Sequence, residues 1–237
     1  MPIRGLLFDK DGTLLDYHAS WMPLNHAIAL FAADGDPELA KRLLVNGGYD
    51  PATGRIRANT PLAAGTPEEI AASFAEVLGR TARTDLGGEV DRMFHAGAAS
   101  SILVEGAVKA IALFRQRTSY LGIATSDSLA GLKASMQAHG VLPQFDFLAA
   151  YDSGHGLKPG PGMALAFCSA CGLAPGEIAV IGDNRHDLDM GRSAGAAMVI
   201  GVLTGTSTRA DFEGHADRVY SGLAEMAGDQ EFITLLV

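Results

Sequence analysis

The chain has 237 residues, a formal net charge of −9, 48% hydrophobic residues and two cysteines. This hydrophobic content is enough for a sizeable core and argues against a disordered chain, and the acidic balance argues against a nucleic-acid partner, which requires clustered Lys and Arg. No apolar stretch approaches the roughly 20 residues of a membrane span, no signal peptide is expected at the N-terminus, and so few cysteines indicate a reducing compartment, so we expect a cytoplasmic protein.

The chain opens with an apolar run over residues 3–8 that predicts a buried strand. Two aspartates, Asp9 and Asp11, follow it, and Gly12 and Thr13 then turn the chain. In open parallel α/β sheets, ligands bind just beyond the carboxyl ends of the strands, so acids at this place indicate a catalytic edge. A polar turn after an edge strand is the alternative, because Asp and Gly are ordinary turn residues.

Residues 17–97 show helical patterns and no convincing buried strand, which predicts a small helical insert. Trp21 and Phe31 lie on one helical stripe, and we assign them to the core of the insert rather than to substrate contact. Thr66 begins a capping box with proline at the first helical position, and Gly79 ends that helix.

From about residue 100, apolar strands alternate with helices. This alternation predicts a parallel sheet with helices on both faces. We therefore expect an α/β fold, with a doubly wound core formed by residues 1–16 and 98–237 and an all-helical cap domain formed by residues 17–97. The expected strands cover residues 120–124, 145–150, 178–181, 197–202 and 218–220, and the expected core helices cover residues 106–117, 128–139 and 162–171.

Reactive side chains follow four of these strands. They are Asp9 and Asp11, then Thr125 and Ser126, then Lys158, then Asp183 and Asp187. Taken singly, each has a structural alternative: a helix N-cap for the Thr-Ser pair and for the last aspartate, and a solvated side chain for the lysine. Together they indicate a site, because four carboxylates at one sheet edge would repel without a cation among them. Oxygen ligands with positions left for water suit Mg²⁺.

These residues resemble the four motifs of the haloacid dehalogenase superfamily, in order and in spacing. Asp9 to Thr13 resembles D-x-D-G-T, Thr125 the Ser/Thr of the second motif, Lys158 to Pro161 the K-P-x-P motif, and Gly182 to Asp187 the G-D-x-x-x-D motif. A helical insert between the first two motifs is similar to the cap of the phosphoglycolate-phosphatase-like branch. The resemblance implies a Rossmann-like core with a cap that closes over the site.

The resemblance also implies roles for the first two aspartates. Asp9 would be the nucleophile that forms an aspartyl-phosphate. Asp11 would be the general acid for the leaving alcohol and then the base that activates water. Family dehalogenases lack an acid at this second position, so Asp11 favours a phosphatase.

The remaining motif residues would bind phosphate and metal. Thr125 and Ser126 would hold phosphate oxygens at a helix N-terminus, and Lys158 would neutralise the developing charge. The implied Mg²⁺ site consists of Asp9, the backbone carbonyl of Asp11, and Asp183, with Asp187 beside it to position Lys158 or a metal-bound water.

The sequence does not decide the roles of several further residues. Arg55 and Arg57 in the insert are candidates for binding a carboxylate or second phosphate of the substrate, with a solvated basic turn as the alternative. The orientations of Lys10 and Asp127 are not fixed by the pattern, and His186 is as consistent with the site as with the surface. The two cysteines, Cys168 and Cys171, lie near a helix C-terminus and favour buried packing over redox chemistry.

We expect a Mg²⁺-dependent phosphatase for a small, phosphoglycolate-like phosphate monoester, as a monomer or homodimer without a nucleic-acid or membrane partner. Its cap hinges should lie near Asp16–Ser20 and Phe94–Ile102. Three alternatives remain: a phosphomutase of the β-phosphoglucomutase type, a non-catalytic phosphate-binding protein of the same family, and a regulatory phospho-accepting receiver module. The last is disfavoured by the insert and by the D-x-D-G-T pattern.

Overall fold

The computed structural model describes residues 2–79 and 85–237. A six-stranded parallel sheet has the order β5-β4-β1-β6-β7-β8. The α/β prediction is confirmed, and each expected core strand is present. The strands are β1 (Gly5–Phe8), β4 (Tyr120–Ala124), β5 (Phe147–Ala149), β6 (Ile178–Gly182), β7 (Met198–Val202) and β8 (Arg218–Tyr220).

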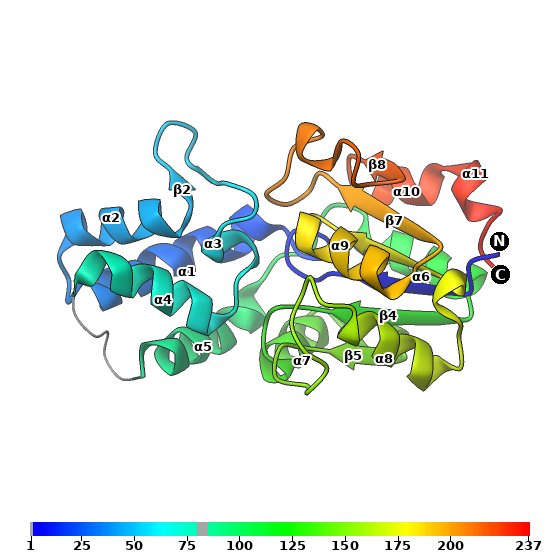
Figure 1. Ribbon diagram of the computed structural model, residues 1–237, viewed down its shortest axis with the longest axis horizontal. Coiled ribbons are helices and arrows are strands. Elements are labelled where there is room, and N and C mark those ends of the chain that lie inside the picture. The colour runs from blue at the N-terminus through cyan, green and yellow to red at the C-terminus, as the bar shows by residue number, and fades with distance from the viewer. Residues whose placement is uncertain (1, 80–84) are drawn as a thin grey trace.

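Helices cover both faces of this sheet (Figure 1). Leu6 and Phe8 of β1 pack in one buried cluster with Phe114, whereas Leu7 packs in the other with Phe167. Successive side chains of a strand point to opposite faces, so a strand covered on both sides is apolar throughout. One face carries α6 (Ala107–Arg117), α7 (Leu129–Ala138) and α10 (Leu223–Gly228), and the other carries α8 (Gly162–Cys171) and α9 (Arg185–Ala194).

Short helices complete the core. They are α11 (Gln230–Ile233) and the 3₁₀ turns Ala98–Ser100, Leu142–Gln144, Pro175–Glu177 and Ala210–Phe212. The chain passes from β1 to β4 and β5 on one side and then returns to β6, β7 and β8 on the other. The strand order therefore reverses around β1, and the crevice beyond its carboxyl end is where a doubly wound sheet binds ligands.

The segment between β1 and the 3₁₀ turn Ala98–Ser100 lies to one side of the sheet (Figure 1). It contains α1 (Tyr17–Ala32), α2 (Pro37–Gly47), α3 (Pro61–Ala64), α4 (Pro67–Leu78) and α5 (Leu86–Gly97), and a hairpin of β2 (Tyr49–Asp50) and β3 (Arg55–Ile56). We call this segment the cap. The cap is mainly helical as predicted, but the hairpin means that it is not all-helical. Strands of two residues are too short to show an alternating pattern in the sequence.

Local signals in the cap behave as the sequence indicates. Thr66 and Glu69 exchange both hydrogen bonds of a capping box at the start of α4. Gly79 ends that helix in the left-handed conformation, which glycine adopts without steric cost. These caps fix where α4 begins and ends, and α4 presents Ile70 and Phe74 to the buried interior of the cap.

The two connections between sheet and cap run side by side. Ile102 accepts a hydrogen bond from the Asp16 amide at 2.8 Å and donates its own amide to Ser20 Oγ at 2.9 Å. The neighbouring residues Leu15 and Leu103 form an antiparallel bridge. The segments in which we expect the hinges are therefore adjacent, although the division into two domains stays a prediction.

The described residues include no helix long and apolar enough to cross a membrane. Both cysteines are free, Cys168 is buried, and burial raises the pKa of its thiol to about 11. A thiol with a raised pKa carries little thiolate, the reactive form. The packing interpretation of this cysteine pair is consistent with the structure.

Candidate active site

A cavity lies where the carboxyl ends of the central strands face the cap, and it spans about 680 Å³ including its opening to solvent. The sheet side supplies residues from all four motifs, and the cap side supplies mainly apolar ones. The sheet side consists of Asp9, Asp11, Thr125, Ser126, Asp127, Lys158, Asp183, Asn184, His186 and Asp187, and the cap side of Tyr17, Trp21, Leu62, Ala63, Ala64, Gly65, Pro67, Ile70 and Phe94.

Lys158 joins two of the carboxylates. Its Nζ lies 2.6 Å from Asp9 Oδ1 and 2.6 Å from Asp187 Oδ1, and its side chain is almost fully buried. Burial alone would lower the pKa of Lys158, but the carboxylates of Asp187 and Asp9 raise it above its ordinary value. The lysine is therefore an ammonium fixed beside the candidate nucleophile.

Asp187 contacts both the start of α9 and Lys158. Its Oδ2 accepts a hydrogen bond from the Asn184 amide at 3.1 Å at the start of α9, while its Oδ1 holds Lys158. A carboxylate at a helix N-terminus is stabilised by the unpaired amides there. The helix start thus fixes the anion that orients the lysine.

Three buried aspartates could hold a metal ion. Oxygens of Asp9, Asp183 and Asp187 lie within 4.8 Å of one another. Burial raises the pKa of Asp9 to about 6, and burial together with the neighbouring Asp9 and Asp187 raises the pKa of Asp183 well above its usual value. A divalent cation would relieve this repulsion, and an all-oxygen donor set fits a hard ion such as Mg²⁺.

Asp183 is fixed by the loop that follows β7. Its Oδ2 accepts hydrogen bonds from the Thr206 amide at 2.8 Å and from Thr206 Oγ1 at 3.3 Å. A Cβ at Gly205 would lie 1.9 Å from that oxygen, and one at Gly12, which has φ +89°, would lie 2.6 Å from it. Only glycine allows this approach. The sequence analysis missed the support from Thr206.

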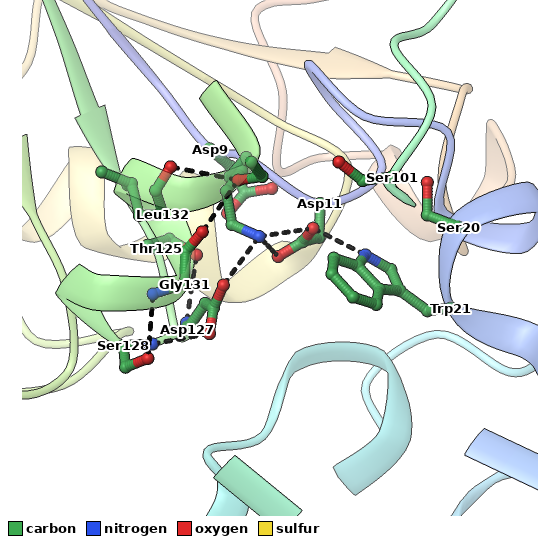
Figure 2. A network of polar contacts seen from close by, with 12 residues as sticks. Asp9, Asp11, Ser20, Trp21, Ser101, Thr125, Asp127, Ser128, Gly131 and Leu132 are labelled. Carbon is green, nitrogen blue, oxygen red and sulfur yellow. Dashed lines mark hydrogen bonds and ion pairs between the residues drawn. The ribbon is translucent and has the colours of Figure 1, made fainter. Parts of the chain in front are cut away.

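Asp11 lies between core and cap. Its Oδ1 accepts hydrogen bonds from Trp21 Nε1 at 2.7 Å and from Lys10 Nζ at 2.8 Å (Figure 2). Burial raises the pKa of Asp11 to about 6, against the lowering effect of the Lys10 ammonium. A carboxyl that titrates near neutrality suits a group that must both donate and accept a proton.

Trp21 does more than the sequence analysis assigned to it. It is buried within the cap as predicted, and it also lines the cavity and contacts Asp11. A buried indole N–H needs an acceptor. That rule, applied to the single tryptophan of the chain, predicts an acceptor for the indole but does not say which one.

The turn after β4 carries the second motif. Thr125 is buried and its Oγ1 accepts a hydrogen bond from the Asp127 amide at 3.1 Å, while Ser126 lines the cavity. Ser128 caps α7 through the Gly131 amide. Asp127 does not face phosphate unpaired, because its Oδ2 lies 2.9 Å from Lys10 Nζ.

The two cap arginines lie elsewhere. Arg55 donates to the Gly205 carbonyl at 3.4 Å and Arg57 to the Val45 carbonyl at 3.5 Å, and neither is among the residues that line the cavity. Their assignment to substrate binding gains no support from this arrangement and stays a prediction. His186 does line the cavity, half-buried, and burial lowers its pKa.

A family model described as haloacid dehalogenase-like hydrolase matches residues 3–195. The chain belongs to this family. The match begins before β1 and ends after α9, so it includes all four motifs and the cap between the first and the second. The predicted family membership is confirmed.

Relatives of this haloacid dehalogenase-like hydrolase carry phosphatase names. The probable phosphatase IndB of Dickeya dadantii is 36% identical over 110 residues, and the match spans 46% of this chain and about half, 47%, of IndB. The N-acetylmuramic acid 6-phosphate phosphatase of Pseudomonas aeruginosa is 26% identical over 196 residues, 82% of this chain and 80% of that protein.

Solved structures share the fold. The crystal structure of a predicted phosphoglycolate phosphatase from Haemophilus somnus 129pt superposes with a TM-score of 0.70 at 17% identity, over 95% of this chain and 97% of that one. At this identity the likeness shows the fold alone.

Proposed function

We propose that the chain is a Mg²⁺-dependent phosphatase that hydrolyses small phosphate monoesters with an uncharged leaving group through an aspartyl-phosphate on Asp9. The chain is a phosphoric monoester hydrolase of the haloacid dehalogenase-like family. The observation that carries the proposal is Lys158 bridging Asp9 and Asp187 beside Asp183, at the base of a cavity whose other wall is apolar.

The nucleophile and its cation are positioned for phosphoryl transfer. Asp9 attacks phosphorus and the alcohol oxygen leaves, so that the phosphoryl group passes to the Asp9 carboxylate. Lys158, fixed by Asp187, neutralises the charge on the phosphoryl oxygens. Thr125 and Ser126 would hold further oxygens ahead of α7.

Asp11 would move the protons. Protonated Asp11 donates to the departing alkoxide, and the resulting carboxylate then takes a proton from the water that attacks the aspartyl-phosphate. The pKa of about 6 places both forms within reach near neutral pH. Asp9, Asp183 and the backbone carbonyl of Asp11 would hold Mg²⁺, which would supply a positive charge between the phosphate and the attacking carboxylate.

The charge of the cavity bears on the leaving group. Among the described residues that line it, Lys158 is the sole permanent cation, and it faces Asp9 and Asp187 rather than the cap. A carboxylate or second phosphate on the substrate would meet an apolar wall and lose hydration without a partner. We therefore favour an uncharged leaving group over the phosphoglycolate-like substrate that the sequence suggested.

The same observation weighs against the phosphomutase alternative. A mutase that returns a phosphoryl group to a sugar phosphate must hold a second phosphate at the cap side of its site. Among the described residues of the cap, those that line this cavity offer no ammonium or guanidinium for it. The adjacent connections at Asp16 and Ile102 support a cap that closes over the substrate and excludes water.

The test is phosphate release from a panel of monoesters that differ in the charge and size of the alcohol, phosphoglycolate included, with Mg²⁺ and again with EDTA. We expect Mg²⁺-dependent release that Asp9→Asn abolishes, with the highest kcat/KM for an uncharged alcohol. Release from no ester would contradict the phosphatase. Transfer of phosphate between sugar positions, with a bisphosphate primer, would favour the mutase.

A further inference from the structure

Lys10 is a buried cation that the mechanism above does not use. Its side chain is fully buried, and it is absent from the residues lining the cavity, so it lies behind Asp11 and not in contact with a bound phosphate. Burying an ammonium costs several kcal/mol unless close carboxylates compensate it. Its position in the D-x-D motif therefore calls for a reason.

The contacts of Lys10 are unequally divided between two acids. Nζ lies 2.8 Å from Asp11 Oδ1, 2.7 Å from Asp11 Oδ2 and 2.9 Å from Asp127 Oδ2. The contact with Asp11 Oδ1 is a hydrogen bond, and the other two are ion pairs. A lysine present only to neutralise Asp127 would not need two contacts with Asp11. The ammonium therefore lies in front of both oxygens of that carboxylate and restrains its position.

Trp21 contacts the same carboxylate from the cap. Its Nε1 lies 2.7 Å from Asp11 Oδ1, and Lys10 Nζ lies 4.9 Å from the centre of the indole ring, within range of a cation–π contact. Phe94 of α5 packs edge-on against the same indole, with 5.6 Å between the ring centres. Figure 2 shows Asp11 with the indole of Trp21 on one side and Asp127 on the other.

We propose that Lys10 is a positioning residue for Asp11, which it holds from the core side while Trp21 holds it from the cap. The inference rests on the proposed function, because it assigns supporting partners to the general acid. Positioning matters at this atom, since a displacement of about 1 Å can cost on the order of 100-fold in rate. Asp127 fixes the lysine in turn.

A charge-balanced double variant isolates the effect. Lys10, Asp11 and Asp127 together carry one net negative charge, and Lys10→Met/Asp127→Asn keeps that net charge while removing both contacts to Asp11. Asp127→Asn alone is the matched control, since it retains Lys10. The double variant avoids leaving two unpaired carboxylates side by side, which Lys10→Met alone would do.

Two esters separate positioning from general damage. The value of kcat/KM reports formation of the aspartyl-phosphate, and this step needs a general acid for an alkyl phosphate but not for p-nitrophenyl phosphate, whose phenolate leaves unprotonated. We expect kcat/KM for the alkyl ester to fall about 10- to 100-fold in the double variant relative to Asp127→Asn, and for p-nitrophenyl phosphate to change less than about threefold. Equal falls for both esters, or no fall for either, would overturn the proposal.

A readout independent of turnover keeps this inference apart from the proposed function. The chain has one tryptophan, so its indole N–H gives a single NMR resonance. We expect the double variant to move this resonance from its place in Asp127→Asn toward that in Asp11→Ala, where the bond is absent. An unmoved resonance would refute the role of Lys10. A wild-type protein without phosphatase activity would refute the proposed function, while the resonance still decides on Lys10.

Discussion

The cavity has two unlike walls. The sheet wall places four carboxylates of the motifs and Lys158 at the strand ends, each fixed by a hydrogen bond or an ion pair. The cap wall is formed mostly by aliphatic and aromatic side chains. We assign different functions to the two walls: the sheet wall carries the reactive groups, and the cap wall excludes water. Charges fixed in advance act more strongly where water is excluded, so an apolar cap strengthens the wall that performs the chemistry.

Removing the cation of the sheet wall should have the largest effect. We expect Lys158→Met to lower kcat about 10²- to 10³-fold, because the transferring phosphoryl group loses its fixed counter-charge. We also expect it to lower the free energy of unfolding by about 3–5 kcal/mol in EDTA, because Asp9 and Asp187 become unpaired in the interior. Steady-state kinetics and urea denaturation measure the two effects.

The control for this variant is Lys133→Met, at an exposed position of α7. It should leave kcat and the free energy of unfolding unchanged within experimental scatter, since exposed charges away from partners contribute little to either. A folded Lys158→Met protein that retains kcat within tenfold would mean that the sheet wall does not depend on this cation.

Placing a cation in the cap wall should have a smaller effect, of the opposite sign for acidic substrates. Ala64 is half-buried at the end of α3 and lines the cavity, so a longer side chain there has an outlet to solvent. We expect Ala64→Arg to raise kcat/KM for phosphoglycolate about tenfold relative to Ala64→Gln, since a charged hydrogen bond contributes about 1.5–3 kcal/mol. An equal kcat/KM in both variants would show that the cap wall does not select by charge.

The two walls also differ in how far the sequence predicts them. Most motif residues of the sheet wall follow apolar runs that end in acids or Ser/Thr, and Lys158 follows in the loop after β5. The carboxyl ends of parallel strands meet at one edge, which brings these residues together. The capping box at Thr66 was predictable for another reason, because its two partners are only three residues apart. Such signals are local in the chain.

What the sequence analysis missed depends on contacts between distant residues. Trp21 reaches Asp11 only because α1 turns back over the motif, and Thr206 reaches Asp183 only because β6 and β7 are neighbours. Neither contact follows from spacing or composition. The possible partners of Lys10 could have been limited to carboxylates, because it stands between two acids after a buried strand. That one of these partners is Asp127 follows only from the fold.

Removing the arginines of the cap should have the smallest effect. Arg55 contacts the Gly205 carbonyl at 3.4 Å and Arg57 the Val45 carbonyl at 3.5 Å, both outside the cavity lining. We expect Arg55→Ala to cost about 0.5–1.5 kcal/mol of stability, because Gly205 adjoins the loop that holds Asp183, and Arg57→Ala to cost less than about 0.5 kcal/mol. In both, KM for charged and uncharged esters should stay within about twofold of wild type.

A tenfold rise in KM for acidic esters alone would contradict this expectation. It would mean that the hairpin of β2 and β3 lies over the substrate when the cap closes. Selection by charge would then depend on β3 and not on the apolar wall.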